Sequence, residues 1–547
     1  MFPVETVNPI DPVRRPRLAP LLGGLVAVAC GVAAPAQDAD ADDPARAFFA
    51  SQPVVTVQIV LDDAAREALT KAPREYVAAS LRLDGTTFAK VGLKLKGAAG
   101  SFQTLGERPG FTVNLGKFGD ASRFHGLARF HLNNGVQDAS RLCEWLGWEV
   151  FTAARLPAPR VAHAIVRLDD RLLGLYVFRE SFDRQFLRRT FGEPAHGNLY
   201  DGGFCQDVDR DLEKDHGDGP DDRSDLRALC ELCRGIDRNR APKLQAAIDV
   251  PTFLDFAALE AMLGHWDGYT QNANNFRLWL PTGGRATFLP HGMDQLFGEA
   301  DASILDHPPA IVASAVMQQP ALRKRYRERL RTLLPLFAPD RLRPRVLAVA
   351  EKVQRTVRPV DPGIADAQAE AVRDLLARIE ARYASLVDQV KAPEPKPVQV
   401  TKGRPWMPKT WLPVAETDGL IVDKKTTQDT PSLRIAVVQR GDEPRRGLWR
   451  THVLLGPGRY ELRATVRCAG VEPPVNGGDG SEQGGVRVRA DGNPSKSLQG
   501  DASWQALVSS FQITEFQRNV ELACELHALA GQAWFRSDSL QLVRVGD

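Results

Sequence analysis

Several features that define large classes of proteins are scarce or absent in this sequence of 547 residues. Seven cysteines are far too few for a small disulfide scaffold. The 70 Lys and Arg residues against 68 Asp and Glu residues leave a formal charge of +2, so no basic excess indicates nucleic-acid binding. No segment after residue 36 reaches the roughly 18 apolar residues of a membrane span. Nucleophile-elbow, HExxH and Walker A motifs are also missing.

What the chain does contain begins with the pattern of an export signal. Three arginines within 14–17 precede an apolar run over 18–34, and small residues close this run. The order of basic, apolar and small residues is typical of a secretory signal peptide. We therefore expect residues 1–36 to be a signal peptide and 37–50 to be a linker, which predicts a secreted or cell-envelope protein.

Two other interpretations of the leader stay open. The apolar run is short for a membrane anchor, yet a single uncleaved anchor is the alternative to a signal peptide. Cys30 follows small residues as at a bacterial lipidation site, so a lipid anchor at Cys30 is the second alternative. Either would tether the chain to the envelope surface.

Composition divides the remaining chain into two blocks. Residues 51–390 show strand patterns first and helical patterns later, including a helix over 139–154 with Asp138 as its cap, which indicates an α+β domain. The proline- and charge-rich segment 391–398 cannot form a continuous helix or a central strand and is predicted to be a linker. Residues 399–547 contain short alternating segments between turns, which predicts an all-β sandwich or jelly roll.

The cysteines of the mature chain leave two questions open. Cys230 and Cys233 form a lone CxxC without a second pair, which favours thiols on a helix over a zinc site. Cys468 and Cys524 lie in separate strand-like segments. In an oxidising compartment they would either bridge these segments or remain as two free thiols.

One stretch of the sequence carries the chemistry. His265 and Asp267 precede an asparagine-rich segment at 272–275, and a β-hairpin predicted over 276–290 leads on to Asp294. Because a hairpin brings its two ends together, Asp267, the asparagines and Asp294 should converge. Phosphoryl transfer uses such a set, in which one Asp orients the nucleophile while an Asn and a second Asp hold Mg²⁺ on the phosphate oxygens.

The spacing of these residues supports the same interpretation. Asp267 and Asn272 reproduce the offset of the kinase loop H-R-D-x-x-x-x-N, with His265 two positions before the Asp. Asp294 takes the place of the metal-binding Asp of D-F-G. Spacing alone is weak support, because Asp267 and Asn272 are also good caps for helices or turns.

Several segments in order resemble one known family. They are VGLKLKGAAGS at 91–101, RPGFTVNL at 108–115, DASR at 138–141, GLYVFRESFD at 174–183, GNLY at 197–200, the stretch 265–275 and PHGMDQLFG at 290–298. Together they resemble the CotH-type spore-coat protein kinase family of secreted atypical kinases, which have a divergent protein-kinase-like fold. The resemblance implies a CotH kinase-like domain over residues 51–390.

The resemblance also implies the roles of the acids and amides. Asp267 would be the catalytic Asp and Asp294 the metal-binding Asp. Asn272 or Asn274 would be the amide on the metal side. The implied cofactors are ATP and Mg²⁺ or Mn²⁺.

Four further residues are implied to bind the nucleotide. Lys94 and Lys96 stand at a basic-x-basic-Gly position where Arg is usual in the family, and Arg108 stands where Lys is common. Glu180 looks like the acid that fixes the nucleotide end of the site. Asp201 departs from the family, where a lysine would be familiar after GNLY. Each of the three cations could instead be a solvated charge on a strand face.

The C-terminal block adds a candidate partner. It contains Trp411, Trp449, Trp504 and Trp534, and exposed rings on a sandwich would suit stacking on sugars, whereas buried rings would be core. The block loosely resembles carbohydrate-binding jelly-roll modules, which implies a glycan as its partner.

Two functions compete on these grounds. The leading prediction is an exported atypical kinase that transfers the γ-phosphate of ATP to Ser or Thr of envelope or extracellular proteins. The alternative is a non-catalytic pseudokinase scaffold or surface protein that binds glycan or a partner through the sandwich. The scarcity of ATP outside the cytoplasm favours the scaffold. The joint presence of Asp267, Asn272 and Asp294 favours the enzyme, because a scaffold has no need of all three.

Overall fold

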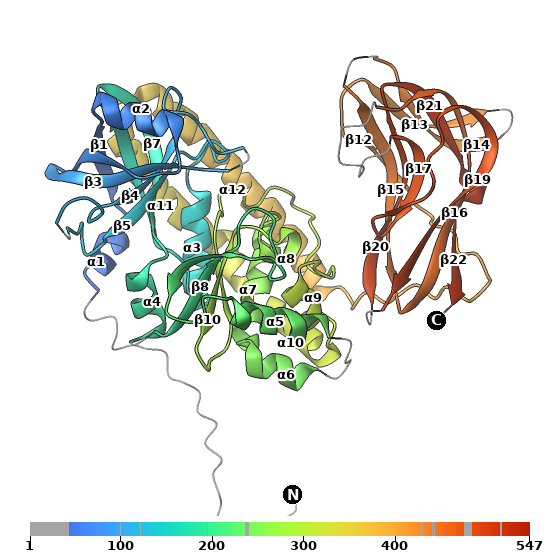
Figure 1. The fold of residues 1–547 in the computed structure, drawn as a ribbon, viewed down its shortest axis with the longest axis horizontal. Coiled ribbons are helices and arrows are strands. Elements are labelled where there is room, and N and C mark those ends of the chain that lie inside the picture. Colours follow the sequence, from blue (N-terminus) through green and yellow to red (C-terminus); the bar gives the residue numbers. More distant parts are fainter. Residues whose placement is uncertain are drawn as a thin grey trace, which may run out of the picture.

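The computed structural model describes residues 43–547 apart from 99, 121, 194, 236–239, 428–429, 440, 442, 475–483, 515–516 and 547. The described chain forms a β-barrel, a helical part that contains a small sheet, and a β-sandwich (Figure 1). The expected mixture of helices and strands is thereby confirmed. The predicted signal peptide over 1–36 and the candidate anchor at Cys30 lie outside the described residues.

The barrel is closed, with the strand order β1-β2-β3-β4-β5-β7-β6 and a parallel pairing of β6 with β1. Period-two alternation builds it, because Leu93 and Leu95 enter the barrel core while Lys94 and Lys96 lie on the other face, as predicted. The strands are β1 (Val54–Val60), β2 (Val77–Leu83), β3 (Thr86–Lys96), β4 (Gly110–Asn114), β5 (Arg129–Asn133), β6 (Val161–Leu168) and β7 (Arg171–Glu180).

Two helices accompany the barrel. Helix α1 (Ala45–Ala50) stands in place of the predicted linker, because Phe48 and Phe49 are buried in the barrel core. Helix α2 (Asp63–Lys71) begins after Asp62, whose side chain accepts a hydrogen bond from the Ala65 N–H at 2.7 Å.

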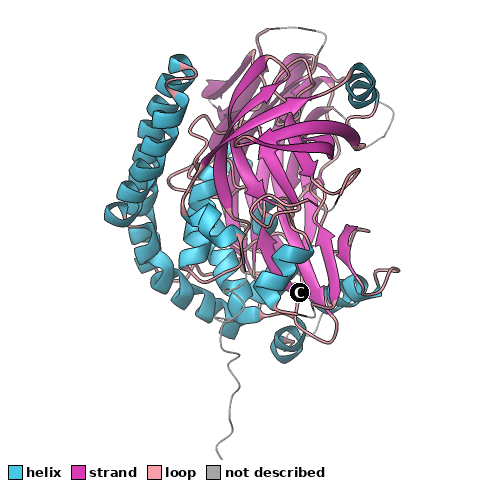
Figure 2. Ribbon diagram, turned by 90° about the vertical axis from the view of Figure 1, so that its left-hand side faces the viewer, coloured by secondary structure: helices cyan, strands magenta, loops and turns pink. Residues whose placement is uncertain are grey.

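The helical part surrounds a sheet with the strand order β11-β10-β8-β9. The turned view shows most helices on one side of the strands (Figure 2). The strands are β8 (Gly197–Asp201), β9 (Glu213–Gly217), β10 (Phe276–Pro281) and β11 (Thr287–Pro290). The helices are α3 (Cys143–Ala153), α4 (Arg184–Phe191), α5 (Ser224–Arg234), α6 (Ala241–Ala247), α7 (Val250–Leu263), α8 (Tyr269–Asn272), α9 (Ile311–Met317), α10 (Pro320–Leu333), α11 (Pro339–Val357) and α12 (Pro362–Lys391).

Two predicted elements of this part can be compared directly with the structure. The hairpin is confirmed, since β10 pairs with β11 from Phe276 opposite Pro290 onward. The helix predicted from residue 139 begins instead at Cys143. The Asp138 carboxylate accepts hydrogen bonds from the Ser140 and Cys143 N–H groups, both at 2.9 Å, and this turn occupies residues 139–142.

The sandwich consists of two antiparallel sheets, with the orders β12-β15-β20-β17-β18 and β13-β14-β21-β16-β19, and β22 pairs with β16. The 391–398 segment that precedes it has no regular structure after α12 ends. The strands are β12 (Leu412–Ala415), β13 (Leu420–Thr427), β14 (Thr430–Val437), β15 (Arg445–Leu455), β16 (Gly458–Glu472), β17 (Gly485–Ala490), β18 (Asn493–Pro494), β19 (Gly500–Ile513), β20 (Arg518–Ala528), β21 (Ala530–Arg536) and β22 (Gln541–Gly546).

The six cysteines among the described residues are free thiols. Cys468 on β16 and Cys524 on β20 lie in different sheets, are both buried, and do not bridge. Cys230 and Cys233 are buried on α5, as the interpretation of helix-lining thiols requires.

The sandwich tryptophans belong mainly to the interior. Trp411, Trp449 and Trp534 are buried, and Trp504 is half-buried. These rings therefore do not form the exposed stacking platform that one interpretation of the sequence allowed.

Candidate active site

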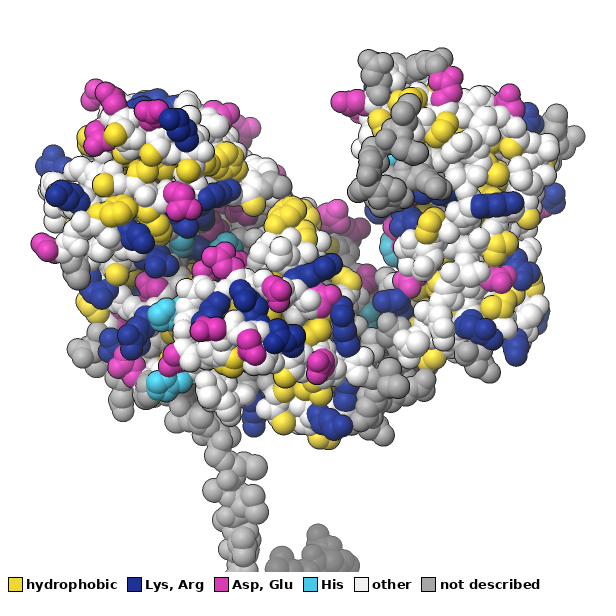
Figure 3. Space-filling view, viewed as in Figure 1, with side chains coloured by type: hydrophobic (Ala, Val, Ile, Leu, Met, Phe, Trp, Pro, Cys, Tyr) yellow, Lys and Arg dark blue, Asp and Glu magenta, His cyan; other side chains and the backbone are white. Residues whose placement is uncertain are grey.

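A pocket of about 430 Å³ lies where the barrel meets the helical part. Basic, acidic and histidine side chains gather there on the surface (Figure 3). Most of the cationic lining comes from the barrel strands and their neighbours, namely Arg74, Lys94, Lys96, Arg129 and Arg179, and β10 adds Arg277. The acids of the lining are Glu144, Asp201, Glu213, Asp215, Asp267 and Asp294, and the amides are Asn133, Asn134, Gln137, Asn274, Asn275 and Gln295.

Asp267 is held by the asparagines that follow it. Its Oδ1 accepts hydrogen bonds from Asn272 Nδ2 at 2.7 Å and from Asn274 Nδ2 at 3.0 Å. Its Oδ2 accepts from Asn275 Nδ2 at 2.8 Å. An ionised carboxylate offers about four acceptor positions, so three amides fix its orientation and one position on Oδ2 remains for another donor.

Hydrogen bonds with buried side chains hold the loop that carries Asp267. Buried Glu260 on α7 accepts hydrogen bonds from the Tyr269 and Thr270 N–H groups, both at 2.9 Å, at the start of α8. Buried His265 donates from Nε2 to the His291 carbonyl at 3.0 Å, which ties this loop to the end of the hairpin. Burial lowers the pKa of His265 to about 4, so the ring is neutral and can serve as this single donor.

A glycine allows the two ends of the hairpin to approach closely. Gly292 has φ +56°, and a Cβ built there would lie 2.2 Å from Asn275 Oδ1. The His291 N–H also donates to the Asn275 carbonyl at 3.0 Å. A side chain at position 292 would therefore displace the amide that holds Asp267 Oδ2.

Asp294 lies in the same pocket as Asp267, as the hairpin predicted. It is half-buried, and burial followed by repulsion from Glu144 raises its pKa to about 7. A carboxylate in this setting is stabilised by a cation. Its position beside other acids therefore favours a bound positive charge.

Lys96 is linked to an acid that the sequence did not single out. Its Nζ donates to Asn133 Oδ1, and Asn133 Nδ2 donates to Glu144 Oε1 at 2.6 Å. Glu144 stands in the first turn of α3 and is buried. Burial, together with nearby Arg179, lowers the pKa of Lys96 to about 7, while Glu144 and Asp294 oppose this shift.

Arg179 is a buried cation with unused donors. It is only 2% exposed, and its Nη2 donates to His291 Nε2 at 3.2 Å. Its Nε and Nη1 are buried without a hydrogen-bond partner among the described residues. Burial lowers the pKa of its guanidinium to about 10. Unpaired buried donors that line a pocket favour an anion such as a phosphate.

The remaining predicted residues divide into two sets. Lys94 lines the pocket, with its Nζ 5.0 Å from the centre of the Tyr76 ring. Asn272 holds Asp267 from outside the described lining. Glu180 and Arg108 are likewise absent from the described lining, so the structure does not bring them to the predicted nucleotide site.

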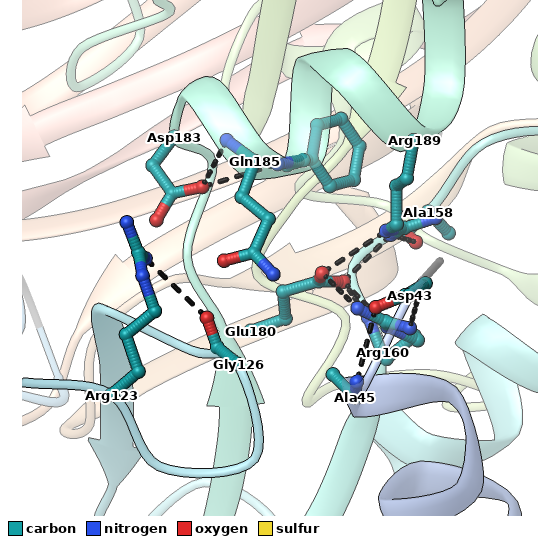
Figure 4. A network of polar contacts seen from close by, with 11 residues as sticks. Asp43, Ala45, Arg123, Gly126, Ala158, Arg160, Glu180, Asp183, Gln185 and Arg189 are labelled. Carbon is teal, nitrogen blue, oxygen red and sulfur yellow. Dashed lines mark hydrogen bonds and ion pairs between the residues drawn. The ribbon is translucent and has the colours of Figure 1, made fainter. Parts of the chain in front are cut away.

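Glu180 is buried in an ionic network behind the pocket (Figure 4). Its carboxylate accepts from Arg160 Nη2 at 2.7 Å and Arg189 Nη2 at 2.6 Å, and Arg160 also pairs with Asp43. Although burial opposes ionisation, the two arginines lower the pKa of Glu180 to about 2. The charge of Glu180, which the sequence analysis placed at the nucleotide, is therefore neutralised within the chain and lies outside the described lining.

Arg108 is also occupied elsewhere. Its Nη2 donates to the Leu175 carbonyl, and its guanidinium lies 5.2 Å from the centre of the Tyr176 ring. Asp201, which departs from the family pattern, pairs with Arg277 at 2.5 Å, and Arg277 also contacts Asp215 at 2.9 Å. This ionic cluster forms one edge of the pocket.

Sequence reasoning missed Glu144 and Arg179 as site residues, and it grouped Asn275 with the converging asparagines without giving it a role. Arg179 and Asn275 lie inside segments that carry the family resemblance, so that resemblance was the available signal. Glu144 had no such signal. Its place depends on the start of α3 at Cys143, which the Asp138 turn determines.

The side chains of the pocket fit a metal ion that is bound together with the phosphates of a nucleotide. Within the described ranges, no group of three or more His, Cys, Asp or Glu side chains is arranged to hold a metal ion. Mg²⁺ commonly takes one or two protein carboxylates and completes its shell with phosphate oxygens and water. Asp294 lines the same pocket as Arg179, whose Nε and Nη1 donors are unpaired among the described residues, and this suits that arrangement better than a resident metal cage.

The CotH kinase protein family matches residues 96–386, which is more than half of the chain. The chain belongs to this family. The predicted CotH membership is thereby confirmed, and the match runs from Lys96 into α12. No curated protein matches this CotH family member. In the part of the chain that the structure describes, no helix is both long and apolar enough to cross a membrane.

Two solved structures overlap a quarter of the chain. One is TmCBM61 in complex with β-1,4-galactotriose, with 11% identity, 25% of this chain and 89% of that chain covered, and a TM-score of 0.17. The other is the enzymatically active domain of tailspike protein 4 of bacteriophage CBA120, with 10% identity, 25% and 19% covered, and a TM-score of 0.19. At these TM-scores neither likeness supports an argument about fold or ligand.

Proposed function

We propose that this CotH family member is an exported atypical protein kinase that transfers the γ-phosphate of ATP to Ser or Thr of envelope or extracellular proteins. Residues 51–390 form its kinase-like domain, with 1–36 as the signal peptide, 391–398 as the linker and 399–547 as the sandwich. The observation that carries the proposal is the convergence of Asp267 and Asp294 in one pocket with a buried, incompletely paired arginine.

Asp267 is the base that accepts the acceptor's proton. The amides of three asparagines hold its carboxylate and leave an acceptor position on Oδ2. In the transfer, a bond forms between the acceptor oxygen and the γ-phosphorus while the bond from that phosphorus to the bridging β–γ oxygen breaks. The hydroxyl proton passes to Asp267, ADP is the leaving group, and the products are a phosphoester and ADP.

The opposite side of the pocket binds the triphosphate and its metal. Asp294 would hold Mg²⁺ or Mn²⁺, which neutralises charge on the phosphate oxygens when it is bound. Lys96 and Arg179 would donate hydrogen bonds to those oxygens, and Lys94 adds a positive charge near the opening. The asparagine Nδ2 atoms face Asp267, so we assign Asn272 and Asn274 first to positioning that carboxylate.

Glu144 positions Lys96 rather than contacting the nucleotide. In protein kinases a strand lysine pairs with a helix glutamate, and both must be in place for activity. Here Asn133 stands between the two charges and connects them by hydrogen bonds to each. We propose that this chain keeps the Lys96 ammonium directed into the pocket.

Calorimetric titration of ATP with Mg²⁺ tests the metal side. Asp294→Asn should abolish or strongly weaken metal-dependent nucleotide binding, because a neutral amide replaces a charged metal ligand. Asp301→Asn is the matched control, since Asp301 is exposed on the neighbouring loop and does not line the pocket. If the unmodified protein binds no nucleotide with any divalent ion, the scaffold alternative is correct.

A further inference from the structure

Two large aromatic side chains are exposed beside the proposed base. Trp266, which directly precedes Asp267, is 54% exposed. Phe204, which lines the same pocket as Asp267, is 60% exposed. The hydrophobic effect favours removing such rings from water, so exposed aromatic side chains at a functional opening mark a binding surface.

Trp266 is fixed although it is exposed. Its indole Nε1 donates to Gln295 Oε1 at 3.1 Å, and Gln295 follows Asp294 and lines the pocket. This bond uses the polar edge of the ring and leaves its apolar faces available. The indole is thus held against Gln295, a residue of the pocket lining.

The segment that carries Phe204 contacts one of the asparagines that hold Asp267. The Cys205 N–H donates to Asn274 Oδ1 at 3.3 Å, and the Gly202 N–H donates to the Phe276 carbonyl at 3.2 Å. The loop that presents Phe204 is therefore bonded to the residues that hold the base. Phe204 thus lines the pocket from a segment that contacts the Asp267 loop, and Trp266 belongs to that loop and contacts the pocket residue Gln295.

In the proposed arrangement these rings are not needed to bind the nucleotide. Its phosphates require the cations Lys94, Lys96 and Arg179, which come from barrel strands. Both aromatic side chains belong instead to segments that carry or contact the Asp267 loop. Glu213 also lines the pocket with Phe204 and adds negative charge there, whereas the charge of Asp215 is paired with Arg277. Apolar faces with an acidic border suit an uncharged or basic acceptor and repel an acidic one.

We propose that Trp266 and Phe204 form the docking site for the protein acceptor, an extended segment with bulky apolar side chains on either side of its Ser or Thr. The inference rests on the proposed kinase function and names the class of acceptor for the same site. The two rings hold the flanking side chains so that the hydroxyl lies at Asp267 Oδ2. They contribute to the choice of acceptor and take no part in the transfer itself.

The test measures acceptor KM for three synthetic serine peptides, flanked by Leu and Phe, by Ala, or by Asp, with Mg²⁺ and saturating ATP. The unmodified full chain should prefer the apolar peptide over the Ala peptide by about 10-fold in KM, the scale of burying one apolar group. The Asp peptide should be the poorest. Trp266→Ala and Phe204→Ala should each bring the ratio of the two KM values close to one.

Two further variants keep the result interpretable. Trp266→Phe retains a ring but loses the bond to Gln295, so it should lose only part of the preference. Phe118→Ala removes a ring that is 45% exposed and is not in the described pocket lining, so it should keep the full preference.

Several outcomes would overturn the inference. Equal KM values for the apolar and Ala peptides in the unmodified protein would do so, as would variants that keep the preference. A rise in the KM for ATP in place of the peptide would assign the rings to the nucleotide. Absence of both ATP binding and transfer to any peptide would instead refute the kinase proposal, together with this inference.

Discussion

Arg179 and Glu180 are neighbours at the end of β7, but only the charge of Glu180 is paired with opposite charges in the described chain. Glu180 faces away from the pocket, and Arg160 and Arg189 saturate its carboxylate. Arg179 faces the pocket and keeps two buried donors unpaired among the described residues. Both side chains are equally buried, at 2% exposure.

The difference shows how to separate structural from functional charge. A buried charge that is paired within the chain contributes to the fold, and removing one partner leaves the other uncompensated. A buried charge whose partner is missing costs stability in the free protein and is retained where a ligand supplies the partner. By this criterion Glu180 is structural, and Arg179 belongs to the binding site.

The largest expected effect is a loss of stability when the charge of Glu180, the paired residue, is removed. Glu180→Gln should lower the free energy of unfolding at pH 7 by about 3 kcal/mol, because two buried arginines lose their shared counter-charge. Glu193→Gln is the control, since Glu193 pairs with Arg188 on the surface and such pairs contribute about 0–1 kcal/mol. Urea unfolding of both variants measures the difference, and equal small losses would contradict the structural role of Glu180.

The same pair predicts a pH dependence. The pKa of Glu180 is about 2 in the folded protein against an ordinary 4.5, so its stabilising effect is full above pH 4.5 and is lost as the pH falls towards 2. The gap in unfolding free energy between the unmodified protein and Glu180→Gln should therefore shrink over that range. A gap that stays constant from pH 5 to the acid limit would refute this account.

A smaller effect is expected from Arg179, the residue without an ion-pair partner among the described residues, and it should fall on ATP binding instead of on stability. Arg179→Gln should leave the unfolding free energy unchanged or higher, because it removes a buried cation that forms no ion pair among the described residues. It should weaken ATP binding by about 10-fold or more, since hydrogen bonds to a charged partner contribute roughly 1.5–3 kcal/mol. Arg171→Gln on the same strand is the control, because Arg171 is exposed and bonds to the Leu105 and Gly106 carbonyls. A stability loss with intact ATP affinity would reverse the assignment.

The smallest effect should come from Lys94. This side chain is half-buried at the opening, where water and salt screen its charge, so Lys94→Ala should weaken ATP binding only about 3-fold. High salt should remove most of that difference. Lys90→Ala, an exposed lysine on the same strand and outside the described lining, should show none.

Local patterns in the sequence were enough to predict the geometry around Asp267. The turn at 281–284 and the flanking alternation predicted a hairpin, and its pairing brings Asn275 beside His291. The alternation of Lys94 and Lys96 with two leucines likewise predicted that both lysines lie on one face of β3. Both features depend on residues that are close in sequence.

The parts that the sequence did not predict depend on distant contacts. On β7 a shift of one residue exchanges the two faces, so the sequence alone could not decide whether Arg179 or Glu180 reaches the pocket. The register of β7 with β5 and β6 decides it. The role of Glu144 likewise requires β5 to place Asn133 beside α3.

Transfer of labelled phosphate from ATP to a serine peptide with Mg²⁺, in the unmodified chain and in Asp267→Asn, tests the central claim most directly. The account predicts that both proteins bind ATP, whereas turnover in Asp267→Asn falls by about 10²-fold or more, the scale of a lost general base. Asp211→Asn, which changes an exposed acid outside the described lining, should transfer normally. Equal transfer by the unmodified chain and Asp267→Asn would contradict the account, as would a chain that neither binds ATP nor transfers phosphate.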